Sequence, residues 1–292
     1  MGIRPSSESP ASHPTTPPLD YSMKQLGLPL EWMLEPQIEQ LELPLFGPET
    51  RIIVPSHDPP TSKKEMDAML CDLAAEGWMM IPGDDRRFNG DGGVGRYIEC
   101  RLGVTAGNRS MADLIGWELK SSASDATLIT LCHKNPDVGS MRAMVDAYGW
   151  PDKKGRQVLH HTITGESALF RIQDDGNNIM IVPKSGDGPT VGWSHSTLMV
   201  AVRKMCYMSF VKVTRVMTDG LRSIRIENVT DYSDLKLAEL IPLILSGKVC
   251  IDFDVRDKVA GSRVLRDRGT KLRSNRAHFR TMYESISTVT FR

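Results

Sequence analysis

The sequence predicts a mixed α/β or α+β protein. Three observations support this class. Apolar residues recur at helical spacing in some segments and alternate with polar residues at period two in others, and the two kinds of segment intermingle along the chain. With 292 residues, the chain can form one large domain or two modest ones.

The chain has no formal net charge that would indicate a nucleic-acid or membrane partner, because Lys plus Arg and Asp plus Glu both number 36. Any affinity for nucleic acid must therefore be local. No apolar run approaches the roughly 20 residues of a membrane span, and the N-terminus lacks a secretory apolar segment. The five cysteines are scattered without zinc-site spacing and fit reduced thiols. We expect a soluble cytoplasmic protein with no membrane partner.

The chain divides by composition. Residues 1–20 are rich in Pro, Ser and Thr and are expected to be a disordered tail, and residues 21–60 contain seven prolines and suit an irregular N-terminal arm. Regular structure begins near residue 61. Ser62 and Glu65 form a capping-box pattern before a helix that Gly77 ends.

Further elements follow in order. Val94, Ile98 and Leu102 share one face of a second helix, and Glu99 lies off that face. Strands are predicted over 115–120 ("IGWELK"), 127–133 ("TLITLCH", a central strand apolar on both faces) and 248–256 ("KVCIDFDVR", which alternates cleanly). Residues 234–247 are predicted to be helical.

The segment "ADLIGWELK" places two acids and a lysine close together. Glu118 and Lys120 share one face of a predicted strand, about 7 Å apart along it. Asp113 has the wrong parity for that face, so Gly116 or a bend near Leu114 must bring its carboxylate round. Two carboxylates beside an ammonium group suit Mg²⁺, which lowers the pKa of a bound water and stabilises charge on a phosphate. The simpler interpretation is an edge strand with a weak Glu–Lys pair.

Two rival motifs are weaker. Asp231, Asp234 and Lys236 have a similar spacing, but they precede an apolar helix and are interpreted as first-turn residues favoured by the helix dipole. "GDGGVG", residues 90–95, matches a dinucleotide-binding pattern but lacks the preceding apolar strand. It is interpreted as a tight loop before a helix.

Taken in order, "GVGRYIECRLG", "ADLIGWELKSS" and "TLITLCHKNP" resemble the MvaI/BcnI group of restriction endonucleases. This group is related to the MutH mismatch-repair nickase within the PD-(D/E)xK nuclease superfamily. Later segments are similar too, so the resemblance covers residues 63–290. It implies a PD-(D/E)xK core, with a mixed sheet flanked by helices, over 61–155. Residues 156–292 would form a DNA-recognition subdomain with a C-terminal basic loop.

The resemblance also implies sequence-specific, Mg²⁺-dependent hydrolysis of double-stranded DNA to 5′-phosphate and 3′-hydroxyl ends. By this resemblance Asp113 and Glu118 bind the metal, Lys120 serves the nucleophilic water, and Glu99 helps to position the metal or the lysine. A monomer is expected, with a cognate DNA methyltransferase in the same system that is not a physical partner. The alternatives are a MutH-like repair nickase and a DNA-binding module with a decayed nuclease core.

The predicted DNA contacts lie in a basic segment. Residues 263–280 contain seven Lys or Arg and one acid. Where the family tends to have a histidine-containing "HDHG"-like loop, this chain has Arg266, Asp267, Arg268 and Gly269. Arginine can read guanine in the major groove, so the target site is expected to differ. The residues chosen for DNA contact are Arg266, Asp267, Arg268, Lys271 and Arg273. A solvated basic face is the alternative.

Overall fold

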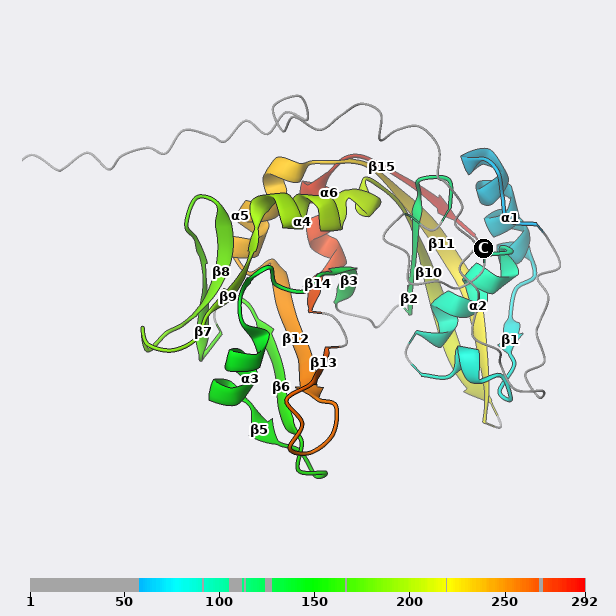
Figure 1. Cartoon of the computed structure of the whole chain (residues 1–292). Coiled ribbons are helices and arrows are strands. Elements are labelled where there is room, and N and C mark those ends of the chain that lie inside the picture. The colour runs from blue at the N-terminus through cyan, green and yellow to red at the C-terminus, as the bar shows by residue number, and fades with distance from the viewer. Residues whose placement is uncertain are drawn as a thin grey trace, which may run out of the picture. The chain divides into compact units, whose positions relative to one another are not determined.

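The computed structural model describes residues 58–90, 92–104, 112, 114–123, 128–165, 167–218, 220–267 and 270–291. The segments expected at 1–20 and 21–60 fall outside this part of the chain, apart from residues 58–60. Asp113 and Arg268 also lie outside it, and the side chain of Asp267 is not described. Helices and strands intermingle throughout, and parallel and antiparallel strand pairs both occur, which confirms the mixed class (Figure 1).

The first sheet carries Glu118 and Lys120 and draws its strands from distant parts of the sequence (Figure 1). Its strands are β1 (Met79–Ile81), β2 (Glu118–Ala123), β10 (Tyr207–Thr218), β11 (Leu221–Leu235) and β15 (Tyr283–Thr290). The order is β1–β11–β10–β2, and β15 pairs with the second half of β11. β2 runs parallel to β10, and the other pairs are antiparallel. The division expected at residue 156 stays a prediction; strands from both sides of it meet in this sheet.

Two helices pack on one face of the first sheet, α1 (Lys63–Ala75) and α2 (Gly93–Arg101), with η2 (Arg86–Phe88) between them. The Ser62 hydroxyl accepts a hydrogen bond from Glu65 N at 3.2 Å, which confirms the predicted N-cap. The Glu65 carboxylate turns to Thr61 N, at 2.8 Å. Gly93 is required at the start of α2, because a Cβ there would lie 1.7 Å from the carbonyl oxygen of Phe88.

Two further sheets complete the described strands. One has the order β3–β14–β12–β6–β5, with β13 on β12, and the other has the order β4–β9–β8–β7. The bounds of the first are β3 (Ile129–His133), β14 (Lys271–Ser274), β12 (Val249–Asp257), β6 (Gln157–Ile163), β5 (Trp150–Pro151) and β13 (Leu265–Asp267). Those of the second are β4 (Val138–Gly139), β9 (Val191–Ser194), β8 (Asn178–Pro183) and β7 (Phe170–Asp174).

The remaining helices, except the short η4, pack into the larger of two hydrophobic cores, which these sheets share with the start of β10 and the end of β11. They are α3 (Met141–Tyr148), α4 (His195–Val202), η3 (Arg203–Met205), α5 (Leu237–Leu245), η4 (Arg276–His278) and α6 (Phe279–Met282). Along β12 the burial pattern alternates as predicted, with Phe253 and Val255 inside and Asp252 and Asp254 on the outer face.

Two sequence interpretations are wrong. β3 was expected to be central, but within the described chain it stands at the end of its sheet and pairs only with β14. Its apolar residues are buried because they join the larger core. Asp231 and Asp234 were assigned to the first turn of a helix, but both lie in β11, and α5 begins only at Leu237. Long-range pairing of β11 with β10 and β15 extends the strand through them.

Candidate active site

A tight turn leads into Glu118. Trp117 N donates to Leu114 O at 2.6 Å, and Leu114 N donates back to Trp117 O at 3.0 Å. Ile115 and Gly116 between them have φ values of 50° and 80°. Positive φ at both central residues is the pattern of a type I′ turn. The strand predicted from Ile115 is therefore wrong at its start, and β2 begins at Glu118.

Three charged side chains meet just after this turn. The Glu118 side chain is 1% exposed, and its Oε1 atom accepts a short hydrogen bond from Lys120 Nζ. The same oxygen accepts from Lys204 Nζ at 3.0 Å. The contact between Glu118 and Lys120 confirms that they share one face of the strand. The structure thus places two ammonium groups on one buried carboxylate oxygen.

Lys204 was missed by sequence reasoning. It lies 86 residues from Glu118, in the short helix η3, and no spacing rule connects the two. The neighbouring Val202 and Met205 are buried in the larger core, and the Tyr283 hydroxyl donates to Met205 O at 2.8 Å. These contacts hold the backbone of η3 in place, so the Lys204 side chain reaches Glu118 from a fixed position.

The second oxygen of Glu118, Oε2, is buried and has no hydrogen-bond partner within the described residues. A buried anionic oxygen without a partner is costly, and a divalent cation satisfies it. Within the same residues no group of three or more His, Cys, Asp or Glu side chains converges. Asp113, the expected second ligand, lies outside them. The orphaned oxygen beside Lys120 therefore fits a metal site to which Glu118 contributes one ligand.

Glu99 lies on α2, which packs against β2. A Cβ at Gly95 would lie 3.1 Å from Ser121 Oγ and 3.8 Å from Glu99 Oε1, so both groups stand close to Gly95. By strand alternation, Ser121 projects from the face of β2 opposite Glu118 and Lys120. The positioning role expected for Glu99 stays a prediction.

The basic segment is partly neutralised within the protein. Lys271 Nζ lies 3.1 Å from Asp254 Oδ2, and Arg273 Nη1 lies 3.2 Å from Asp252 Oδ2. Arg266 is exposed on β13. Lys271 and Arg273 are thus held on the polar face of the sheet by the carboxylates of β12, and their contact with DNA stays a prediction.

A polar groove of about 500 Å³ lies near the candidate site, because Phe210, which lines it, pairs with Lys120 in the strand register. Ser122, on the same strand face as Glu118 and Lys120, lines its wall. Among the residues that the structure describes, its charged lining residues are Lys212, Arg276 and Arg280, and no Asp or Glu lines it. Hydroxyl and amide side chains supply most of the remaining polar lining. This groove suits a phosphate-rich ligand.

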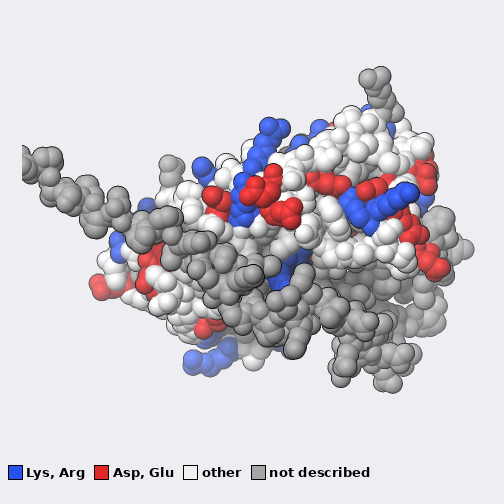
Figure 2. All heavy atoms as spheres, turned by 90° about the horizontal axis from the view of Figure 1, so that it is seen from above, with Lys and Arg blue, Asp and Glu red and all other residues white. Residues whose placement is uncertain are grey.

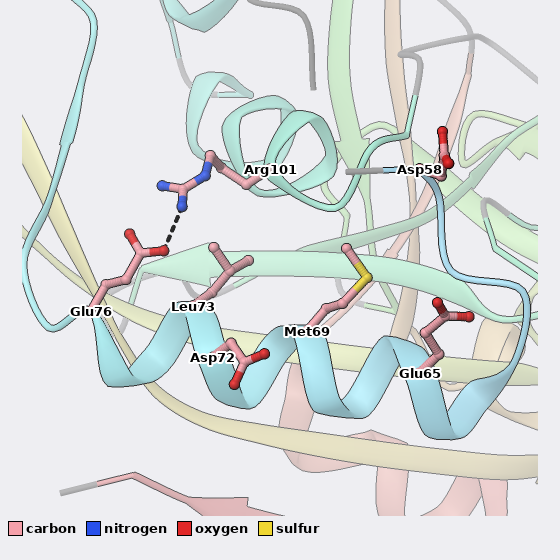
Figure 3. Close-up of a pocket in the computed structure, with 7 residues that line it drawn as sticks. All are labelled: Asp58, Glu65, Met69, Asp72, Leu73, Glu76 and Arg101. Carbon is pink, nitrogen blue, oxygen red and sulfur yellow. Dashed lines mark hydrogen bonds and ion pairs between the residues drawn. The ribbon is translucent and has the colours of Figure 1, made fainter. Parts of the chain in front are cut away.

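Two other parts of the surface are less suited to an anion. On the face shown in Figure 2, basic and acidic side chains are interspersed, in keeping with the zero net charge. A separate hollow beside α1 carries four carboxylates and Arg101, which pairs with Glu76 (Figure 3). Its lining carboxylates are those of Asp58, Glu65, Asp72 and Glu76. Its acidic lining disfavours a phosphate, and Glu118 and Lys120 are not part of it.

The fold is that of a restriction endonuclease. The structure resembles the solved complex "Restriction endonuclease MvaI-cognate DNA substrate complex" with a TM-score of 0.66 and 20% identity, covering 78% of this chain and 99% of that chain. The same enzyme in the absence of DNA gives a TM-score of 0.45 at 18% identity, covering 76% and 95%. A search of curated protein sequences found no match.

The family follows from the sequence match. The model of the MvaI/BcnI restriction endonuclease family matches residues 68–283, which is more than half of the chain. The chain belongs to this family, as the resemblance predicted, and its fold is of the PD-(D/E)xK type. It is a DNA endonuclease of type II restriction kind, and the family implies a divalent metal cofactor. No helix in the described residues is long and apolar enough to cross a membrane.

Proposed function

We propose that this chain is a Mg²⁺-dependent restriction endonuclease that hydrolyses DNA phosphodiester bonds to 5′-phosphate and 3′-hydroxyl ends. The observation that carries the proposal is the buried Oε2 atom of Glu118, which has no hydrogen-bond partner in the described part of the chain and lies beside the ammonium group of Lys120. Glu118 and Asp113 would hold the ion. When bound, Mg²⁺ supplies a water of lowered pKa and offsets charge that develops on the phosphate.

The residues of the chain have distinct parts in this reaction. Lys120 is partly exposed, at 23%, and its ammonium group can turn from Glu118 to the attacking water. There it orients the water and balances the added negative charge. Glu118 stays buried and fixed by its surroundings. Glu99, on the adjoining helix, is proposed to help position the metal or Lys120.

The substrate proposal rests on the groove beside the site. Arg276 and Arg280 line it, together with Lys212, which pairs with Glu227 Oε2 at 2.7 Å behind the lining. A groove whose charged lining is basic and which lies near the reacting residues suits a duplex backbone. Arg266, Asp267, Arg268, Lys271 and Arg273 are proposed as DNA contacts, to bases or to phosphates.

The setting of the enzyme completes the proposal. We expect it to act as a monomer in the cytoplasm, with a cognate methyltransferase encoded in the same system to protect host DNA. All five cysteines are free thiols in the structure, which supports a reducing compartment. An adjacent methyltransferase gene is the observation that would strengthen the restriction role most.

Plasmid cleavage tests the proposal. Purified protein with Mg²⁺ is expected to convert supercoiled plasmid DNA into discrete linear fragments that DNA ligase rejoins without prior phosphorylation. Chelation of the metal is expected to stop cleavage. Glu118→Gln removes the anionic ligand and should lower the rate by about a thousandfold, equivalent to about 4 kcal/mol.

Each contrary outcome has a clear meaning. Nicked circles alone would favour a MutH-like nickase. Binding of DNA by the unmodified chain without cleavage of any tested sequence would favour a decayed nuclease core. Cleavage that persists fully in Glu118→Gln would remove the assigned site from the reaction.

A further inference from the structure

We infer that Lys204 is a positioning residue of this nuclease, which holds the Glu118 carboxylate so that Oε2 faces the metal. This inference rests on the proposed function and adds a residue to it. Lys204 Nζ lies 3.0 Å from Glu118 Oε1, and Glu118 is almost fully buried. Lys204 itself is 18% exposed.

The two lysines on Oε1 have different structural origins. Lys120 follows Glu118 on β2, so its backbone moves with the carboxylate that it contacts. Lys204 comes from η3, which Val202, Met205 and the Tyr283 hydroxyl anchor in the larger core. Lys204 is therefore anchored on a different element from Glu118, and the hydrogen bond that it donates fixes Oε1 relative to the larger core.

A second lysine is needed because Lys120 has two tasks. It contacts Oε1 in the structure, and in the reaction it serves the attacking water. While Lys120 is turned to water, a carboxylate held by Lys120 alone would lose its only partner. Lys204 keeps one oxygen of Glu118 occupied throughout, so the other oxygen keeps its direction. A charged hydrogen bond of this kind is strong in a site that excludes water.

The inference predicts the sign of a change in metal binding. Loss of a positive charge near the metal would, by Coulomb's law alone, strengthen metal binding. Loss of a positioning hydrogen bond weakens it. Lys204→Met is therefore expected to raise at least threefold the Mg²⁺ or Mn²⁺ concentration that half-saturates metal-induced thermal stabilisation. Lys204→Arg keeps a charged donor and should recover most of the wild-type affinity.

Cleavage gives a second readout. The single-turnover rate at saturating metal is expected to fall at least tenfold in Lys204→Met and to recover in Lys204→Arg. Affinity for a DNA duplex without metal should change less than twofold. Arg203→Met is the matched control, because Arg203 is exposed on the same short helix, and it should match the wild type in both assays.

The outcomes separate this inference from the proposed function. If the unmodified chain binds metal but never cuts DNA, the proposed function fails, and the metal titration still tests Lys204. Tighter metal binding in Lys204→Met, or metal binding and cleavage equal to those of the wild type, would overturn the inference. If Lys204→Met does not fold, Lys204→Gln takes its place in the metal titration. Gln keeps a hydrogen-bond donor without the charge, so this variant is expected to retain part of the wild-type metal affinity. Loss of that affinity in both Lys204→Gln and Lys204→Arg would also overturn the inference.

Discussion

The guanidinium group of Arg276 lies over the ring of Phe210, with 5.1 Å between the guanidinium carbon and the ring centroid. Phe210 belongs to β10, directly beside Lys120 of β2 in the strand register. The stacking contact therefore holds a cation in the lining of the groove near the candidate active site. Arg280 lines the same groove.

The groove leads to a prediction about salt. Each phosphate contact contributes about −0.9 to the slope of log affinity against log salt concentration. Arg276→Ala and Arg280→Ala should each weaken duplex binding and reduce the steepness of this slope by about 0.9. Fluorescence anisotropy over a salt series measures it. Lys236→Ala is the control, because Lys236 pairs with Glu284 at 3.4 Å outside the groove lining. Unchanged slopes in both groove variants would place the DNA elsewhere.

A second prediction concerns the carboxylate of Asp252, which faces both Arg273 and Lys271. Asp252→Asn removes the carboxylate that pairs with Arg273 and leaves Lys271 paired with Asp254 alone, so the polar face of the sheet becomes more basic. If that face meets DNA, binding to unrelated duplexes should tighten and its salt dependence should steepen. Competition between a cleaved and an uncleaved duplex measures the loss of discrimination. Unaltered binding in this variant would show that the face does not meet the duplex.

The turn before Glu118 gives a stability prediction. Ile115 adopts φ = 50°, which is unfavourable for a β-branched side chain. Ile115→Asn creates an Asn-Gly pair, the preferred sequence of a type I′ turn, and should stabilise the fold by about 0.5–1 kcal/mol. Gly116→Ala imposes a Cβ at φ = 80° and should destabilise it by about 1 kcal/mol or more. Urea denaturation checks both, and effects of the same sign would contradict the turn assignment.

Cysteine chemistry provides a prediction about pH. Burial raises the pKa of the Cys132 thiol to about 12, although Lys204 and Lys120 oppose the shift. An unfolded thiol has a pKa of about 8.5. The fold is therefore favoured fully below pH 8.5, and this contribution is lost as pH rises toward 12. Stability measured between pH 7 and 10 should fall less in Cys132→Ala than in the wild type.

Thiol labelling checks the same shift more directly. At pH 8 a thiol reagent should modify the exposed Cys71 in the native protein and reach Cys132 only after unfolding. Rapid labelling of Cys132 in the native state would contradict its burial.

Local signals in the sequence predicted the local structure well. The cap at Ser62 and the shared face of Glu118 and Lys120 depend on neighbours in the sequence, and the structure confirms both. The alternation of β12 was predicted for the same reason. The MvaI/BcnI resemblance was confirmed because it rested on several motifs in order.

Interactions between distant segments could not be predicted in this way. Lys204 reaches Glu118 only because α4, which contacts β3 and β9, and the η3 segment that follows it bring the lysine there, and nothing in "VRKMC" indicates that contact. The end of β11 was missed for the same reason, since Asp231 and Asp234 are strand residues only through pairing with β10 and β15. Asp113 lies outside the described residues, so its role as metal ligand stays a prediction.

The long antiparallel pair of β10 and β11 has a mechanical consequence. Val211 and Ile226 belong to the smaller core, whereas Phe210 and Tyr232 belong to the larger one. The same two strands therefore contribute to both hydrophobic cores. We expect that neither core can unfold while the packing of the other stays intact. Heat should unfold the described part of the enzyme in a single calorimetric peak. The contact between Lys204 and Glu118 should be lost only in that same transition.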